Sequence, residues 1–279
     1  MPWLPALHSP VKGRRAMPDL QIREMTVQDE PFIASCTHVG ETEEWDASCN
    51  RRIPWLREMG TQGMRVLVAL LDGRQVGFLY LFPIKVAPAG PLGRDLSVIQ
   101  CLAVKDESKG HGAGQALVTA AEAEARRQGK KGIVVTAYYH DFWFMPAAFF
   151  ERCGFSVARR KGQTAIMWKA FDASAEAPHF IARRYHFVPV AGKVAIDLFW
   201  SRSCLTTDTE AERVREVAAE FGDQVVLREH CTDDPAIRAQ YGIYRAILID
   251  GKEVSWGYEA PKEGLREAIQ RALANGGET

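Results

Sequence analysis

The stretch Cys101-Leu-Ala-Val-Lys-Asp-Glu-Ser-Lys-Gly-His-Gly-Ala-Gly-Gln-Ala-Leu117 decides the fold of this chain. An apolar run ending at Val104 predicts a strand, and three alternate glycines then open a segment with helical periodicity. Glycine lets several backbone N–H groups converge on one ligand without obstruction by Cβ, and the helix that follows adds the positive end of its dipole. The stretch therefore predicts an anion cradle that suits a pyrophosphate.

The spacing of the glycines narrows the kind of phosphate ligand. Gln115 stands where G-x-G-x-x-G requires its third glycine, and the chain contains no G-x-x-x-x-G-K-[ST], so a dinucleotide fingerprint is disfavoured and a P-loop is absent. The run instead resembles the coenzyme A signature Q/R-x-x-G-x-G/A of the GNAT acyltransferase family, with Lys109, Gly112 and Gly114 at its fixed positions. A second signature of that family, F/L-Y-E-x-x-G-F, is similar to residues 149–155. The resemblance extends over residues 20–171.

The resemblance implies a fold and a co-substrate. The expected fold is mixed α/β (α+β): a twisted, mostly antiparallel sheet flanked by helices, in which the strand at 102–104 diverges from the strand at 132–137. The backbone amides of Leu102 and Val104 would then pair with the pantetheine of acetyl-CoA. The residues implied to hold acetyl-CoA are Leu102, Ala103, Val104, Lys109, Gly110, His111, Gly112, Ala113 and Gly114.

Acyl transfer to an amine needs a base and an acid, and the usual positions do not supply them here. The tyrosine frequent in the family's second signature aligns with Phe150, and a frequent glutamate of the core strand aligns near Val98. The substitutes that follow the divergent strand are Tyr138, Tyr139, His140 and Asp141. His140 is the first choice because an imidazole titrates near neutral pH. A packed aromatic wall is the alternative interpretation of this run.

The distribution of charge along the chain gives two indications about the ligands of the protein. The net charge is zero, so nothing global recruits nucleic acid or a membrane, but residues 193–279 carry 11 Lys and Arg against 16 Asp and Glu. The front of the chain is thus positive, at about +5, which favours an anionic ligand there. A candidate site for a cationic amine is formed by four acidic residues beside two tryptophans: Glu41, Glu43, Glu44, Asp46, Trp45 and Trp55. The alternative interpretation of these residues is a solvated helix face.

The length of 279 residues predicts about two domains. We expect a disordered leader at 1–16, the GNAT acetyl-CoA-binding domain at 17–171, a linker at 172–192 and a second α/β domain at 193–279. In the second domain we expect strands at 194–200, 224–229, 245–249 and 253–256, a helix beginning at a capping box of Thr209 and Glu212, and a final helix.

This second unit resembles a thioredoxin-like fold, and the two-part chain resembles YoaP-like acetyltransferases. Ser201 stands where thioredoxins place the attacking cysteine of W-C-x-x-C, so ordinary dithiol exchange is excluded. Cys204 remains a candidate reactive thiol, because it lies just before a helix whose dipole can lower a thiol pKa.

The six cysteines are scattered without any C-x-x-C pair, which predicts no zinc site or disulfide framework and favours a reducing cytoplasm. No stretch has the length of a membrane helix or the form of a signal peptide. The sequence therefore predicts a cytoplasmic N-acetyltransferase that moves acetyl from acetyl-CoA to a small-molecule or amino-acid-like amine, with a protein amine as second choice. The alternative is a non-catalytic acyl-CoA sensor regulated by Cys204; oligomeric state stays open.

Overall fold

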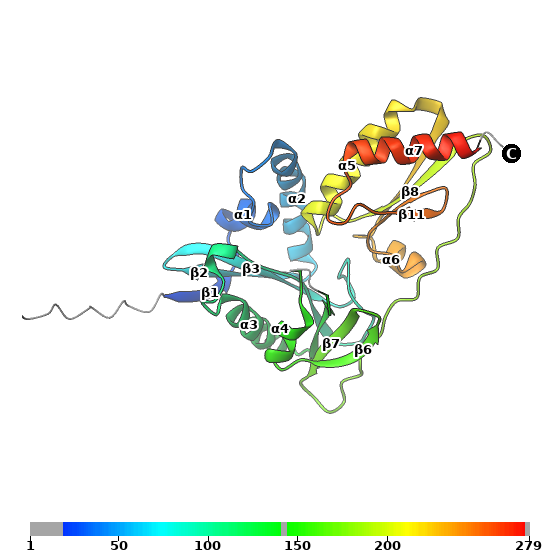
Figure 1. The fold of residues 1–279 in the computed structure, drawn as a ribbon. Helices are drawn as coiled ribbons and strands as arrows, with labels where there is room; N and C mark the ends of the chain where they lie inside the picture. Colours follow the sequence, from blue (N-terminus) through cyan, green and yellow to red (C-terminus); the bar gives the residue numbers. More distant parts are fainter. Residues whose placement is uncertain (1–18, 141–143, 277–279) are drawn as a thin grey trace, which may run out of the picture.

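The computed structural model describes residues 19–140 and 144–276, which form two α/β units joined by an extended segment (Figure 1). The expected leader and Asp141 lie outside the described residues. The first unit is built on a seven-stranded sheet with the order β1-β2-β3-β4-β5-β7-β6. Its strands are β1 Leu20–Glu24, β2 Arg65–Leu71, β3 Arg74–Pro83, β4 Leu96–Val104, β5 Gly132–Tyr138, β6 Ser156–Lys161 and β7 Thr164–Ala170.

Every neighbouring pair in this sheet is antiparallel except β4 and β5, which confirms the predicted mixed, mostly antiparallel fold class. A tight turn of Asp72 and Gly73 joins β2 to β3 as a hairpin. Both residues have positive φ, 49° and 77°, as the tight turn between two twisted strands requires.

Helices cover both faces of the large sheet because its strands alternate apolar side chains to the two sides (Figure 1). Val66 and Val68 of β2 pack with α1 and α2, whereas Leu67 and Ala69 pack toward α3. The helices are α1 Glu30–Ala34, α2 Glu43–Thr61, α3 Ala113–Arg127 and α4 Ala147–Arg152, with short 3₁₀ turns at Val27–Asp29 and Asp106–Ser108.

The second unit has a four-stranded sheet with the order β11-β10-β8-β9, in which β8 and β9 are parallel and the other pairs antiparallel. Helices α5 and α7 pack on one face through Val214 and Leu265, and Phe199 marks the other face. The elements are β8 Val194–Trp200, α5 Leu205–Glu220, a 3₁₀ turn at Gly222–Gln224, β9 Val225–Cys231, α6 Pro235–Tyr241, β10 Ala246–Ile249, β11 Lys252–Val254 and α7 Lys262–Gly276.

The predicted start of the first helix in this unit is wrong. Helix α5 begins at Leu205 with Cys204 as its N-cap, so Thr209 and Glu212 lie inside the helix. The reason is local hydrogen bonding: Thr207 Oγ1 donates to the carbonyl oxygens of Ser201 and Cys204 and fixes the first turn earlier than the capping box. Helix α6 was not predicted at all.

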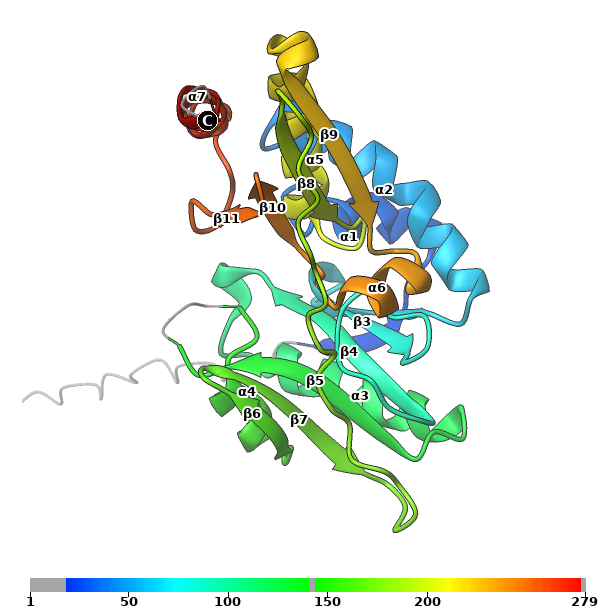
Figure 2. The same ribbon diagram turned by 90° about the vertical axis from the view of Figure 1, so that its right-hand side faces the viewer.

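The two units meet where α2 lies alongside α5, a contact that both views show (Figure 2). Ser48 Oγ and Arg51 Nη2 both donate to Oδ2 of Asp208 at 2.7 Å, and Arg213 Nη2 lies 2.6 Å from Oε2 of Glu44. The connecting segment 172–192 is extended, and its His179 pairs with Leu92 in an isolated bridge. The C-terminal unit is therefore docked on the N-terminal one by specific polar contacts.

Candidate functional site

Strand β4 bends away from β5 at a bulge. Cys101 pairs with Tyr80 and Ile99 with Leu81, so Gln100 has no partner in β3. A bulge bends its strand and increases the local twist. The pairing of β4 with β5 ends at the same place, at Ile99 and Val135, and the rest of β4 has no neighbour on that side within the described sheet. The bulge therefore produces the divergence that the family resemblance implies.

The bulge also sets which groups face the opened side. The Lys105 N–H donates to Val76 O on the β3 side at 2.8 Å. Because N–H groups alternate sides along a strand, those of Leu102 and Val104 point away from β3, toward the gap left by β5. The bulge also changes the face of the sheet to which each following side chain points. Cys101 and Ala103 contact the cluster under α1 and α2, and Leu102 packs toward α3.

The glycine-rich turn follows at the same end of β4. Gly110 and Gly112 have φ of 87° and 81°, and Gly112 is the N-cap of α3. A Cβ built at either position would meet no atom within 4 Å, so the space beside the turn is open. Within the described chain, the backbone N–H groups of residues 110–115 donate to no other residue, as expected at a helix N-terminus.

The remaining members of the predicted cradle fit this arrangement. His111 is exposed, Ala113 is buried in the first turn of α3, and Gly114 lies against the ring of Phe149. Lys109 is exposed, with its Nζ 2.5 Å from Asp106 Oδ1. The turn thus offers unpaired amides and a cation to one anionic ligand, and a pyrophosphate fits these donors.

A cavity of about 670 Å³ opens from the divergence and is closed by the C-terminal unit. Gln100, Cys101, Leu102 and Ala103 of β4 line it from the sheet side. The C-terminal unit contributes the N-terminus of α5, one residue of α6, the 242–245 loop and residues 257–258. Its lining residues include Cys204, Thr206, Arg238, Tyr244, Arg245 and Tyr258. Except for Cys204, sequence reasoning missed these residues, because their place depends on how the two units dock.

Two of the four residues predicted to be catalytic line this cavity. Tyr138 and His140 do, with their rings stacked at 5.0 Å between centroids. Burial raises the pKa of the Tyr138 phenol. Tyr139 is not among the lining residues, and its hydroxyl donates to Glu151 Oε1 at 2.6 Å. Tyr138 is the last residue of β5 and Tyr139 follows it, and consecutive side chains of an extended chain point to opposite sides, so only Tyr138 faces the cavity.

The cavity wall is cationic. Its described lining residues include Arg183, Arg238 and Arg245 but no Asp or Glu. The acidic residues at 41–46, predicted as a candidate site for a cationic amine, do not line it. Glu44 is engaged by Arg213 and Lys262 instead, and Trp55 is buried in the core. That acidic cluster therefore lies outside this cavity, and its interpretation as an amine site stays a prediction.

Three thiols, Cys36, Cys101 and Cys204, line the cavity. Behind them lies Arg52, which is fully buried and donates to the carbonyl oxygens of Arg202 and Ser203. Burial raises the pKa of the Cys204 thiol, and this effect outweighs the hydrogen bond and nearby cations that lower it. The dipole of the following helix was expected to lower the thiol pKa of Cys204; the residue lies closer to the helix than predicted, as the N-cap of α5, but desolvation dominates.

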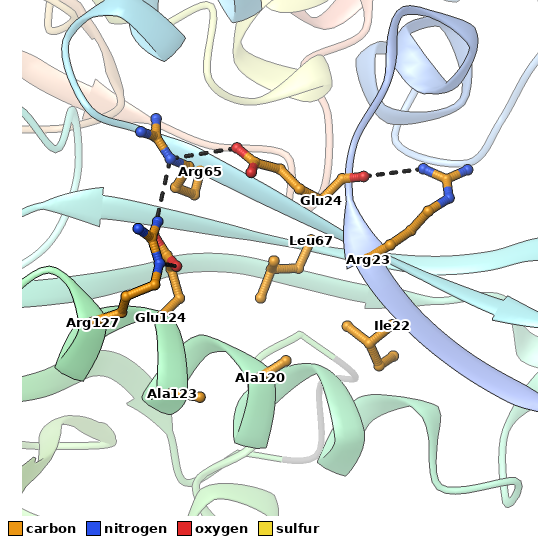
Figure 3. A pocket seen from close by; sticks show the side chains of 9 residues that line it. All are labelled: Ile22, Arg23, Glu24, Arg65, Leu67, Ala120, Ala123, Glu124 and Arg127. Atoms are coloured by element: carbon orange, nitrogen blue, oxygen red, sulfur yellow. Dashed lines mark hydrogen bonds and ion pairs between the residues drawn. The ribbon is translucent and has the colours of Figure 1, made fainter.

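A second pocket of about 330 Å³ lies against the C-terminal half of α3, away from the glycine-rich turn (Figure 3). Arg65 stands between Glu24 and Glu124 there, at 3.4 and 3.9 Å, and Arg127 pairs with Glu124 at 2.7 Å. These charges satisfy one another. Among the described residues, no group of three or more His, Cys, Asp or Glu is arranged to hold a metal ion, and none of the described helices is long and apolar enough to cross a bilayer.

Comparison with known proteins gives matches to one enzyme family. The family profile described as "Acetyltransferase (GNAT) domain" matches residues 62–157. Solved structures that resemble the chain include a ribosomal-protein-alanine N-acetyltransferase from Brucella melitensis, at 22% identity and a TM-score of 0.41, covering 54% of this chain and 99% of that one. Comparison with curated proteins finds no significant match.

Two further structures belong to the same group of matches. The PaiA N-acetyltransferase of Thermoplasma acidophilum, in complex with coenzyme A, is 20% identical, with a TM-score of 0.39 and coverage of 55% of this chain and 99% of that one. The GNAT family N-acetyltransferase YhbS of Escherichia coli, in complex with CoA, is 22% identical, with a TM-score of 0.40 and coverage of 59% and 85%. The family profile spans the bulged β4, the glycine-rich turn and α3, so residues 62–157 of this chain match a GNAT acetyltransferase domain over the elements described above.

Proposed function

We propose that this protein is an N-acetyltransferase that transfers acetyl from acetyl-CoA to the amine of a small molecule or amino-acid-like metabolite. The observation that carries the proposal is the shared end of β4 and α3. There the outward amides of Leu102 and Val104 lie beside the unpaired amides at the N-terminus of α3. An extended pantetheine and a pyrophosphate need these two sets of donors in this order along the chain.

Acetyl-CoA would supply the acyl thioester when it is bound. The amides of Leu102 and Val104, with Ala103 between them, would hold pantetheine, and Lys109 with residues 110–114 would hold the pyrophosphate. His140 accepts the proton of the acceptor ammonium. Tyr138 stays protonated at neutral pH, because burial raises its pKa, and donates to the leaving sulfur. Tyr139 and Asp141 have no role in this proposal.

The C-terminal unit, in this proposal, is a thioredoxin-like domain at 193–279, as in YoaP-like acetyltransferases. Its strand order and the parallel β8-α5-β9 connection support this assignment. Its role is to close the acceptor end of the cavity. Thiol exchange has no support, because Ser201 Oγ donates to Asp233 Oδ1 at 2.5 Å where a cysteine would attack, and the Cys204 thiol is buried. A reducing compartment such as the cytoplasm stays a prediction.

The test is isothermal titration with acetyl-CoA and free CoA, followed by an assay of CoA release over a panel of amines. Gly112→Glu places a carboxylate in the cradle and should abolish micromolar binding, about −8 kcal/mol. Gly129→Glu is the matched control: it has a similar φ of 69°, equally open surroundings and an exposed position just beyond the C-terminus of α3, and it should bind normally.

Two results would count against the proposal. If the folded wild-type protein binds no CoA, the acetyltransferase assignment fails. If acetyl-CoA binds but none of the amines tested causes the release of CoA, the acetyltransferase assignment is replaced by a sensor that binds acyl-CoA without turnover.

A further inference from the structure

One guanidinium in the cavity wall has no counter-ion. Arg238, in the last turn of α6, is only 6% exposed, and none of the described carboxylates lies within ion-pair distance of it. Its Nη2 donates to Gly90 O at 3.0 Å and to Pro91 O at 2.8 Å. Nε is buried without an acceptor, and Nη1 also lacks one among the described residues. Desolvation lowers the pKa of this group.

The other arginines of the wall differ from Arg238. Arg245 donates to both carboxylate oxygens of Glu210 at 2.8 Å, and Arg183 lies 2.7 Å from Glu253. Arg52, behind the wall, uses its donors on protein carbonyls, a thiol and a hydroxyl, and it does not line the cavity. Of the described lining residues, Arg238 is thus the arginine whose charge is left unmatched.

A buried cation without a counter-ion is costly, and a ligand that brings one negative charge relieves that cost. A carboxylate has this chemistry and pairs well with a guanidinium. Arg238 lines the same cavity as Tyr138 and His140, the proposed proton-transfer groups. A neutral or cationic acceptor would leave the charge unmatched.

We propose that Arg238 binds the carboxylate of the acyl acceptor, so that the substrates are carboxylate-bearing amines of the α-amino acid class. This inference rests on the proposed function, since it places the acceptor in the same cavity as the acyl donor. It also assigns specificity to the C-terminal domain, whose Arg238 lies outside the residues that the GNAT profile matches.

The test uses a panel of L-α-amino acids, each beside its neutral carboxamide. Binding to the CoA-saturated protein is measured by ligand-observed NMR, and CoA release from acetyl-CoA is measured in parallel. We expect at least one amino acid to bind and react at least about tenfold better than its amide. In Arg238→Gln the ratio of acid to amide should fall to near one, while the affinity for acetyl-CoA is unchanged.

Arg183→Gln is the matched control, because Arg183 lines the same cavity but is exposed and paired with Glu253. It should keep the preference for the acid. A purely structural role, in which Arg238 only holds Gly90 and Pro91, predicts equal losses for acid and amide in Arg238→Gln. The inference is overturned by that result, by equal binding of acids and amides to the wild type, or by a panel in which no acid binds. Failure of the proposed function looks different: acids bind preferentially through Arg238, but no CoA is released.

Discussion

Ser48 in α2 donates a 2.7 Å hydrogen bond to Oδ2 of Asp208 in the first turn of α5, and both side chains are buried. Arg51 Nη2 reaches the same oxygen at 2.7 Å. One carboxylate therefore ties a helix of the N-terminal unit to the helix whose N-terminus closes the cavity. This contact is one of those that hold the C-terminal unit against the N-terminal unit, where the two units together line the cavity.

Replacing that carboxylate tests the docking directly. Asp208→Asn should lower the free energy of unfolding in urea by about 1–3 kcal/mol, because it removes the negative charge that Arg51 pairs with and leaves a neutral amide oxygen as the acceptor for Arg51 and the buried hydroxyl. Glu216→Gln on the same helix is the control. Its side chain is 57% exposed and pairs with Lys262, so the change should stay within about 0.5 kcal/mol. An Asp208→Asn protein as stable as wild type would show that the contact does not secure the interface.

Substitution of the adjacent residues Tyr138 and Tyr139 distinguishes a catalytic hydroxyl from one that only contributes to packing. Tyr138→Phe should reduce kcat by about 10²-fold through loss of a proton donor, with the Kd for acetyl-CoA unchanged. Tyr139→Phe removes a hydroxyl that bonds to Glu151 outside the cavity, so kcat should stay within twofold of wild type, about 0.4 kcal/mol. Steady-state kinetics on both variants checks this. Equal effects at the two positions would contradict the assignment of Tyr138.

The buried Cys204 thiol should be a poor nucleophile near neutral pH. Burial raises its pKa, so the thiolate is scarce at pH 7 and its fraction increases as the pH rises through and beyond 9. Peptide mapping after iodoacetamide treatment should therefore show alkylation of Cys204 at least about tenfold slower in the folded protein than in urea at pH 7.5. Faster labelling in the folded state would mean that the helix dipole prevails over desolvation.

Asp29 predicts a pH-dependent contribution to stability. Burial alone would raise the pKa of its carboxyl, but hydrogen bonds from Arg23, Thr26 and Gln75 outweigh burial and hold the pKa well below its usual value. A lowered folded pKa stabilises the protein above the unfolded value near 3.9, and this contribution is lost as the pH falls toward the folded pKa.

Asp29→Asn should accordingly cost about 2–4 kcal/mol at pH 7 and clearly less at pH 3, measured by urea unfolding at both values. A constant difference between the two pH values would show that the carboxyl is not protonated differently in the folded and unfolded states.

The local parts of the site could be predicted from sequence because their causes are local. The glycines at 110 and 112 occupy left-handed conformations just before α3, as their residue type indicates. Divergence of β4 and β5 was implied by the family resemblance, but its cause, the bulge at Gln100, was not predicted, because one polar residue in an apolar run does not distinguish a bulge from a regular strand.

The rest of the site depends on contacts between residues far apart in the chain. Arg238 lies on a seven-residue helix, too short to show periodicity, although Asp234 and Pro235 are start signals that could have revealed it. Nothing in the sequence places that helix beside Gly90. Likewise, the sequence placed Cys204 before a helix but not at its N-cap, and the burial that raises the pKa of the thiol arises only from docking.

The extended segment at 172–192 separates the two units along the chain, so the ribosome synthesises one unit after the other. The ribosome completes the CoA cradle before it has made the residues that close the acceptor end of the cavity, so the first unit to emerge holds the donor site alone. Under the proposed function, the part of the cavity that would select the acceptor is added last, by the C-terminal unit. Variation in that unit can change which amine is chosen while the strands and turn that face the acyl donor stay as they are.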